Sequence, residues 1–578
     1  MAKPVKEKKP GIFSLLKPYR SIVLLLILFT LISNGINLWL PKIIADGIDA
    51  YTNGTYKINP VLIKFSAAVL SIFVFTYLQS ILQTYASEKV ARDLRATLSD
   101  KISKQSFAFI EKANPSKLLT NLTADVDSIK IFISQAIVSI VSSLFIIIGA
   151  SVLLITINWK LALCIIATIP IIGITFFLVL RKVRALFIEA RAVIDWLNKV
   201  INESILGAAI IRVVNSQIPE YNKFLEANTK AKHYGLSILR LFAGLIPVIT
   251  FTANMAALSI LALGGHFVIE GSMSLGSFAA FNSYLVMLIF PILVIGFMSN
   301  IIAQASASYQ RISTVIEAPE PAETGTVTEP LKGKIEIEHV NIMYGQMPVL
   351  KDISFTAMPG SKTAVIGPTA AGKTQLLYLL TGLIQPTSGD IKFDDRTIAE
   401  YNSEAFHRQV GFVFQDSIMF NMTIKENIAF GDNATDESLA KAIETAELKD
   451  FIDALPDKLQ TMVSERGSSL SGGQKQRLML ARALALNPKI LLLDDFTARV
   501  DNNTEEKILK NIQKNYPDLT LISVTQKVTT VENYDKIILL MQGELVASGT
   551  HEELMHTSPE YVQLLNSQKS TSNYELQS

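Results

Sequence analysis

Apolar residues in the first half of the chain gather in six long runs, each long enough to cross a bilayer as a helix of about 20 residues. The predicted spans lie near Ser21–Leu40, Val61–Tyr85, Ile133–Ile157, Leu161–Leu180, Leu241–Ile269 and Leu275–Ala303. Basic residues precede the first run, as in a signal peptide. No small-residue cleavage site follows it and five further spans do, so we expect it to stay as a membrane helix.

The loops between these spans differ sharply in positive charge. Met1–Arg20, Ser87–Lys130 and Arg181–Arg240 together hold 24 Lys and Arg residues, and the other loops hold 3. Under the positive-inside rule both termini face the cytoplasm. The two long basic loops keep helical spacing of apolar residues, so the spanning helices should continue beyond the bilayer. Turn-like interruptions at Asn114–Ser116 and Ser216–Pro219 predict short transverse helices that contact the second half of the chain.

The pattern changes after the sixth run. Residues 317–333 begin rich in Pro and Glu and are predicted to be a linker between a transmembrane domain, residues 21–316, and a second domain, residues 334–566. In that domain alternating strands such as Lys334–Val340 precede a series of strands and helices, which predicts an α/β fold with a mixed, mainly parallel sheet. Residues 1–20 are predicted to form a cytoplasmic segment and residues 567–578 a disordered tail.

Composition agrees with a membrane protein and excludes some functions. Of the 578 residues, 49% are hydrophobic, too many for a wholly soluble chain. The net charge of +2 gives no overall attraction to nucleic acid. Cys164 is the single cysteine and lies in an apolar run, so an intrachain disulfide and a multi-cysteine metal site are excluded.

The second domain contains a phosphate-binding pattern. Gly367–Thr374 has the spacing G-x-x-x-x-G-K-T between an apolar strand and a helix. Such a loop turns successive backbone N–H groups towards one anion, and the helix N-terminus adds its dipole. Lys373 would reach the β- and γ-phosphates, and the Thr374 hydroxyl would bind Mg²⁺. The candidate nucleotide-binding residues here are Gly367, Thr369, Ala370, Ala371, Gly372, Lys373, Thr374 and Gln375.

A second glycine-rich stretch, Leu470–Arg477, leads directly into a helix and precedes the apolar strand Ile490–Asp494. This stretch resembles the signature motif of ATP-binding cassette (ABC) transporters, in which it follows a phosphate-binding loop in the same domain. Six spans followed by one cassette are similar to a half-transporter of the ABC exporter superfamily. The resemblance implies a six-helix transmembrane domain followed by an α/β nucleotide-binding domain, and ATP hydrolysis coupled to transport.

The resemblance also implies roles for single residues. Tyr344 would stack on adenine, Asp501 is the D-loop aspartate, and Thr374, Gln415 and Asp494 would hold Mg²⁺. Ser471, Gly472, Gly473 and Gln474 would complete the ATP site of a second cassette. Glu465–Gly467 resembles the short loop that contacts the transmembrane domain in exporters.

Two departures from the family pattern concern catalysis. Asp495 stands where the family has a glutamate as general base, and Gln526 stands at the switch position that is normally histidine. A carboxylate displaced by about 1 Å can cost on the order of 10²-fold in rate, and glutamine carries no titratable proton. Ala370 replaces a common glycine, which should be tolerated because the backbone amide faces phosphate.

An intact signature beside a degenerate catalytic pair resembles the shorter subunit of bacterial heterodimeric multidrug exporters. This resemblance implies ATP and Mg²⁺ as cofactors, a lipid bilayer as environment, and a plasma-membrane location. The partner would be a second half-transporter with the consensus glutamate and histidine, the substrates amphipathic compounds, and nucleic acid is excluded as a partner. A homodimeric lipid or peptide exporter and an ATP-gated channel or regulatory subunit remain alternatives.

The last two spans carry a mixture of aromatic, Met and Asn residues that suits an amphipathic cavity, although packing between helices is the favoured interpretation. They are Phe242, Phe251, Asn254, Met255, Phe278, Phe281, Asn282, Tyr284 and Met287.

Overall fold

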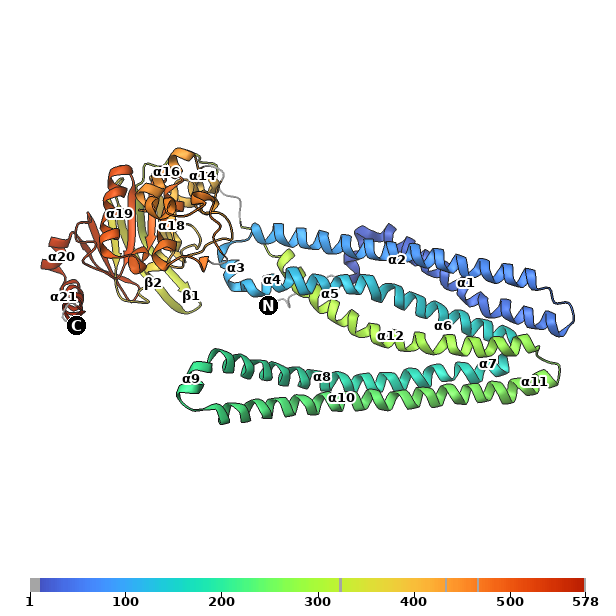
Figure 1. Ribbon diagram of the computed structural model, residues 1–578. Coiled ribbons are helices and arrows are strands. Elements are labelled where there is room, and N and C mark those ends of the chain that lie inside the picture. The colour runs from blue at the N-terminus through green and yellow to red at the C-terminus, as the bar shows by residue number, and fades with distance from the viewer. Residues whose placement is uncertain (1–10, 322–324, 432–433, 465–466, 576–578) are drawn as a thin grey trace, which may run out of the picture. The chain divides into compact units, whose positions relative to one another are not determined.

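The computed structural model describes residues 11–321, 325–431, 434–464 and 467–575 (Figure 1). The chain divides into two compact units. The first comprises the residues up to Lys104 with Ala113–Pro319, and the second comprises Gln105–Lys112 with the chain from Glu320 onward. The predicted order, an apolar helical half followed by an α/β half, is confirmed.

The first unit is entirely helical in its described part, and six of its helical segments are long and apolar enough to span a membrane. They run over Ile12–Thr52, Ile58–Ser103, Pro115–Ile157, Trp159–Leu206, Gln217–Ile269 and Leu275–Ile316. Each has at least 41 residues, about twice the length that a bilayer requires, as the helical spacing in the loops predicted.

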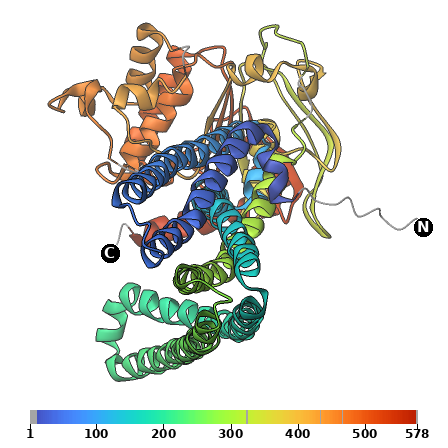
Figure 2. The same ribbon diagram turned by 90° about the vertical axis from the view of Figure 1, so that its right-hand side faces the viewer.

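Within these segments the helices are as follows. They are α1 (Arg20–Thr52), α2 (Ile58–Ser103), α4 (Pro115–Thr120), α5 (Val126–Ile131), α6 (Ile137–Ile157), α7 (Trp159–Ile166), α8 (Thr168–Leu206), α9 (Ala208–Val213), α10 (Gln217–Ser259), α11 (Gly265–Ile269) and α12 (Leu275–Ile316). Helices α8 and α10 run side by side and are joined by α9, while α1 packs on α2, α6 and α12 (Figures 1 and 2).

A buried hydrogen bond joins α12 to α1 inside the apolar core. The Tyr284 hydroxyl donates to the Leu38 backbone carbonyl over 2.9 Å, near Pro41, which interrupts the N–H series of α1. Pro41 has no N–H for the Asn37 carbonyl, and the Tyr284 bond to the neighbouring Leu38 carbonyl joins the two helices beside this break. Tyr284 and Phe281 are buried among helices, which favours the packing interpretation for them, whereas Phe251 and Met255 are exposed.

The N-terminus of α12 is capped by a side chain from α1. Asp49 accepts hydrogen bonds from the Gly276 amide at 2.7 Å and from the Ser274 hydroxyl at 2.6 Å. A carboxylate at a helix N-terminus satisfies free N–H groups and interacts favourably with the helix dipole. A Cβ at Gly276 would lie 2.1 Å from the Ala45 carbonyl oxygen, so α1 and α12 can approach this closely only with glycine there.

The two interruptions in the basic loops correspond to short helices, but not at quite the predicted residues. In the first loop α3 (Phe107–Ala113) precedes Asn114, whose side chain caps α4, and the Phe107 ring contacts Tyr378 within the second unit. In the second loop α9 lies before the predicted interruption, and Ser216 is the N-cap residue of α10. The first loop therefore contributes a contact to the second unit through Phe107 of α3. Helix α9 of the second loop belongs to the first unit.

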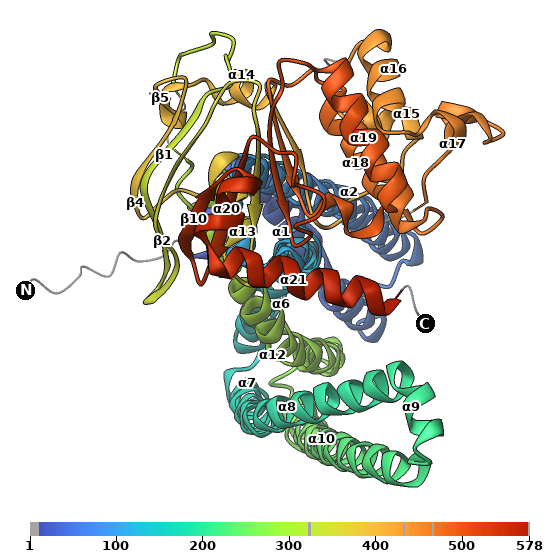
Figure 3. The ribbon, with the colours of Figure 1, turned by 90° about the vertical axis from the view of Figure 1, so that its left-hand side faces the viewer.

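The described residues of the second unit form two sheets (Figure 3). Their strands are β1 (Ile335–Tyr344), β2 (Met347–Ala357), β3 (Lys362–Ile366), β4 (Ser388–Phe393), β5 (Arg396–Thr397), β6 (Val410–Val413), β7 (Ile490–Asp494), β8 (Thr520–Thr525), β9 (Lys536–Met541) and β10 (Glu544–Gly549). The six-stranded sheet has the order β10-β9-β3-β8-β7-β6 and is parallel except for β10.

The single mixed sheet expected from the sequence is thus wrong in one respect. Strands β2, β1, β4 and β5 form a separate antiparallel sheet. Only two residues connect β1 to β2, and so short a connection can join only antiparallel neighbours.

The helices of this unit are α13 (Lys373–Leu380), α14 (Ser403–His407), α15 (Ile424–Ile428), α16 (Asp436–Thr445), α17 (Lys449–Asp453), α18 (Gly472–Leu484), α19 (Asn502–Asn515), α20 (His551–Thr557) and α21 (Pro559–Glu575). Helix α21 continues to Glu575, into the residues that were predicted to be a disordered tail. Residues 560–575 contain no proline or glycine that would end a helix begun at Pro559.

Candidate functional site: a cavity at the edge of the parallel sheet

Four adjacent parallel strands of the six-stranded sheet end at one edge, and each is followed by a predicted site residue. Strand β3 leads into the phosphate-binding loop, β8 into Gln526, β7 into Asp495 and β6 into Gln415. The carboxyl edge of a parallel sheet is where ligands bind in α/β proteins. Residues separated by up to 160 positions are therefore brought to one place.

A cavity of about 440 Å³ lies at this edge. Ten of the predicted nucleotide and metal residues line it together with the two predicted catalytic positions, and two valines were not predicted. The lining residues are Tyr344, Val349, Thr369, Ala370, Ala371, Gly372, Lys373, Thr374, Gln375, Gln415, Asp494, Asp495, Val524 and Gln526. Val524 precedes the switch position by two residues in a buried strand, so the strand pattern could have identified it.

The phosphate-binding loop is held in shape by Lys373. Its ammonium is largely buried and donates to the backbone carbonyls of Gly367 and Pro368, both at 2.8 Å. Burial lowers the pKa of Lys373, and the carboxylates of Asp495 and then Asp494 act in the opposite direction. A cation in this position suits the β- and γ-phosphates of a nucleotide.

Glycines are required at both ends of the loop. Gly367 has φ +153°, and a Cβ there would lie 2.0 Å from the Leu540 carbonyl oxygen. Gly372 has φ +96° at the start of α13. Ala370 adopts φ +64°, a left-handed conformation that costs a non-glycine residue about 1–2 kcal/mol. The alanine is thus accommodated with backbone strain, a cost that the sequence interpretation did not include.

Oxygen donors for a hard cation meet beside the loop. The Thr374 hydroxyl donates to an Asp494 carboxylate oxygen at 3.3 Å, and Asp494 is 2% exposed. Burial raises the pKa of Asp494, the Thr374 hydrogen bond lowers it, and the Asp495 carboxylate adds to the rise. A buried carboxylate beside a hydroxyl and a neighbouring negative charge fits Mg²⁺, which prefers oxygen ligands.

Asp495 is fixed by its backbone. It has φ 45°, and its N–H donates to the Val524 carbonyl of β8 at 2.9 Å. Burial raises the pKa of Asp495, whereas Lys373 and Lys527 lower it. The backbone of Asp495 cannot move further into the cavity without breaking this hydrogen bond to β8, so the short side chain cannot be compensated by a backbone shift.

Two further residues of the cavity are positioned by neighbouring glutamines. The Tyr344 hydroxyl donates to the Gln375 side-chain oxygen at 2.8 Å, which places the ring beside the phosphate-binding loop. The Gln415 backbone carbonyl accepts from the side chain of Gln476, a buried residue of α18. An aromatic face beside the loop can contact a nucleotide base.

Comparison with known proteins identifies the family. The model of the ABC transporter transmembrane region matches residues 23–292, and the ABC transporter model matches residues 350–498. The chain is 34% identical to the uncharacterized ABC transporter ATP-binding protein YfiB of Bacillus subtilis (strain 168), over 96% of this chain and 98% of the relative. The chain belongs to the ABC transporter family. It is an ABC exporter half-transporter with membrane and ATP-binding domains, and it couples ATP hydrolysis to transport.

Other ABC transporters similar to the chain carry different substrate names. The ATP-dependent lipid A-core flippase of Syntrophus aciditrophicus (strain SB) is 30% identical over 85% of this chain and 82% of the relative. The probable multidrug resistance ABC transporter ATP-binding/permease protein YheI of Bacillus subtilis (strain 168) is 29% identical over 95% of both chains. A bacterial Atm1-family ABC exporter solved with ATP bound has the same fold, with a TM-score of 0.77 and 24% identity over 95% of this chain and 99% of that chain.

The ABC signature residues lie outside the cavity. Ser471 is the N-cap residue of α18. Its hydroxyl accepts from the Gln474 amide at 3.3 Å, and the Gln474 side chain accepts from the Ser471 amide at 2.8 Å. This reciprocal capping box fixes the helix N-terminus. A Cβ at Gly473 would lie 2.9 Å from the Arg499 carbonyl oxygen, and one at Gly472 would lie 3.1 Å from the Arg499 side chain.

The D-loop residue Asp501 also lies outside the cavity and caps α19, accepting from the Thr504 amide at 2.9 Å. That amide and the Thr504 hydroxyl lower the pKa of Asp501. Residues 465 and 466 of the predicted exporter loop fall outside the described part of the chain. The cavity of this ABC transporter is therefore lined by the predicted phosphate, metal and switch residues, and the predicted signature residues lie elsewhere on the same unit.

Proposed function

We propose that this chain is the degenerate-site subunit of a heterodimeric ABC exporter that moves amphipathic compounds out of a bacterial cell. It would lie in the plasma membrane with both termini in the cytoplasm, as the basic loops favour. Its own cavity would bind ATP and Mg²⁺ and hydrolyse slowly. Its signature would serve the ATP site of a second half-transporter.

The observation that carries this proposal is the pairing of Asp495 and Gln526 in one cavity. One replacement shortens the general base by a methylene, and the other removes the titratable ring at the switch position. The binding residues around them, Lys373, Thr374 and Asp494, are intact. A site that retains binding groups and loses catalytic ones suits ATP occupancy with little turnover.

The cavity residues have separate tasks under this proposal. The loop amides and Lys373 bind the phosphates, Thr374 and Asp494 hold Mg²⁺ with Gln415, and Tyr344 contacts the base. Mg²⁺ would supply charge neutralisation on the β- and γ-phosphates. Gln526 donates its side-chain amide to the γ-phosphate, and Asp495 orients water poorly because its carboxyl group stops short.

The remaining site residues act on a second cassette. ABC exporters act as dimers in a membrane, and Ser471–Gln474 with Asp501 would close the partner's ATP site. The capping box supports this use, since it presents the first amides of α18 in a fixed orientation. The relative named as a multidrug resistance transporter supports amphipathic substrates.

A homodimeric lipid exporter is the second candidate, favoured by the relative named as a lipid A-core flippase. ATPase measurements on the purified full-length chain, alone and with a second half-transporter that carries a consensus glutamate, separate the two. The heterodimer predicts that the chain alone hydrolyses at most a few per cent as fast as the complex. A stable dimer of this chain alone, with turnover similar to that of the complex, would support the second candidate and overturn the first.

A further inference from the structure

The loop at the switch position is attached to the C-terminal helix by one side chain. Gln568 of α21 donates from Nε2 to the backbone carbonyl of Gln526, and its Oε1 accepts from the Val528 backbone N–H at 2.9 Å. A single primary amide thus forms two hydrogen bonds with the two backbone groups that flank Lys527. Such a bridge fixes the path of the loop as a paired strand would.

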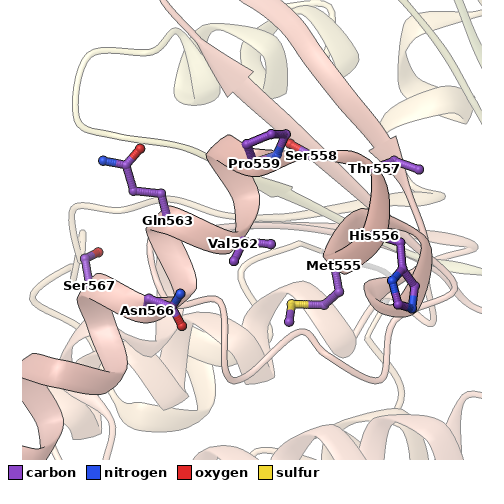
Figure 4. Close-up of a pocket in the computed structure, with 9 residues that line it drawn as sticks. All are labelled: Met555, His556, Thr557, Ser558, Pro559, Val562, Gln563, Asn566 and Ser567. Carbon is purple, nitrogen blue, oxygen red and sulfur yellow. The ribbon is translucent and has the colours of Figure 1, made fainter.

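Helix α21 is itself anchored on the face that carries Gln568. Tyr561 is fully buried and its hydroxyl lies 2.6 Å from His551 Nδ1, and Leu565 is also buried. Residues 561, 565 and 568 follow helical spacing, so these anchors and the amide share one side of the helix. Gln563, five residues earlier on the same helix, is exposed and lines the pocket shown in Figure 4, whereas Gln568 does not line it.

The same loop is held from a second direction by α19. The Lys527 ammonium lies 3.7 Å from the buried carboxylate of Glu505 and 3.4 Å from the Asn502 side-chain oxygen. Lys527 therefore restrains the loop through its side chain, and Gln568 restrains it through its backbone. Gln526 is left with a fixed main chain and an exposed side chain at the cavity.

We propose that Gln568 is a positioning residue for ATP binding, because it holds the backbone of Gln526 where the side-chain amide can meet the γ-phosphate. A loop fixed before the ligand arrives loses less conformational entropy on binding. This role of Gln568 rests on the proposed binding of ATP in this chain's own cavity, and it needs neither a particular partner nor a particular transported substrate.

The γ-phosphate gives the test its specificity. ADP lacks that group, so loss of the bridge should weaken binding of a triphosphate and leave ADP binding unchanged. Loss of a hydrogen bond of this kind corresponds to about a fivefold change in the dissociation constant. Gln568→Met keeps the length and apolar contacts of the side chain and removes both hydrogen bonds, and Gln563→Ala on the same helix is the matched control.

The experiment titrates the full-length chain in lipid nanodiscs with fluorescent AMP-PNP and ADP in the presence of Mg²⁺. We expect about fivefold weaker AMP-PNP binding for Gln568→Met, unchanged ADP binding, and wild-type values for Gln563→Ala. In a Gln526→Ala background, Gln568→Met should have no additional effect. Unchanged AMP-PNP binding, equal weakening of both nucleotides, or an additive effect in the double variant would each overturn the proposal.

The two nucleotides also serve as an internal check on folding, since a misfolded cassette would lose both. AMP-PNP is not hydrolysed, so the affinity ratio can be measured whatever the turnover of the chain. Rapid hydrolysis by the chain alone would contradict the heterodimer proposal and would leave the role of Gln568 to be decided by the affinity ratio.

Discussion

The replacement Asp495→Asn tests the asymmetry of the proposed exporter most directly. The Asp495 main chain is fixed by its hydrogen bond to the Val524 carbonyl, so its carboxyl group stays about one methylene short of a glutamate's reach. A displacement of about 1 Å costs on the order of 10²-fold in rate. The site of this chain should then supply on the order of 1% of the ATPase activity of the assembled complex.

Asp495→Asn should therefore leave nearly all ATP turnover of the complex, whereas glutamate-to-glutamine replacement in the partner should leave on the order of 1%. The variant should also bind ATP more tightly, because Asp495 adds negative charge where phosphate binds. Of the carboxylates near Lys373, Asp495 raises the pKa of the ammonium most. Phosphate release by the purified complex measures turnover, and nucleotide titration of this chain measures affinity. If Asp495→Asn abolished ATPase activity, Asp495 would be a working general base and the asymmetric mechanism would be wrong.

Three other variants test separate parts of the structure. Lys373→Ala should weaken ATP binding to this chain at least tenfold and leave partner hydrolysis partly intact; labelled-ATP binding checks this, and unchanged affinity would contradict the phosphate role. Gly473→Ala places a methyl group 2.9 Å from the Arg499 carbonyl oxygen. It should reduce ATP turnover of the complex more than Lys373→Ala does, and a smaller loss of turnover would point away from a heterodimer. Tyr284→Phe should lower stability by about 1 kcal/mol in a thermal unfolding assay without changing basal nucleotide affinity, and an unchanged melting temperature would show that the Leu38 carbonyl finds another partner.

The sequence predicted the parts of the fold whose physical signal is local. Runs of apolar residues were sufficient for six membrane helices, since length and composition alone decide whether a helix can span. The spacing of Gly367–Thr374 was sufficient for the phosphate-binding loop, because each residue type there answers a local backbone requirement. The split into two sheets depended on pairing between distant strands, and only the short connection between β1 and β2 pointed to it.

The candidate site shows the same division. Residues that follow strands, such as Asp495 and Gln526, could be named from motif order, and the structure places them at one cavity. Gln568 could not, because nothing in the sequence near it indicates that a polar residue late in a helix reaches a loop 42 positions earlier. The strain at Ala370 was also missed, since a left-handed φ at an alanine has no sequence signal.

The cap that Asp49 places on α12 has a consequence for how often α1 and α12 separate. It joins α1 to the N-terminal end of α12. The chain continues to the ATP-binding domain from the other end of α12, at Ile316. Separating the two helices there would break the two hydrogen bonds of Asp49, at a cost of about 0.5–1.5 kcal/mol each. Every 1.4 kcal/mol reduces a spontaneous opening tenfold. The Asp49 cap therefore makes separation of α1 and α12 at this end less frequent.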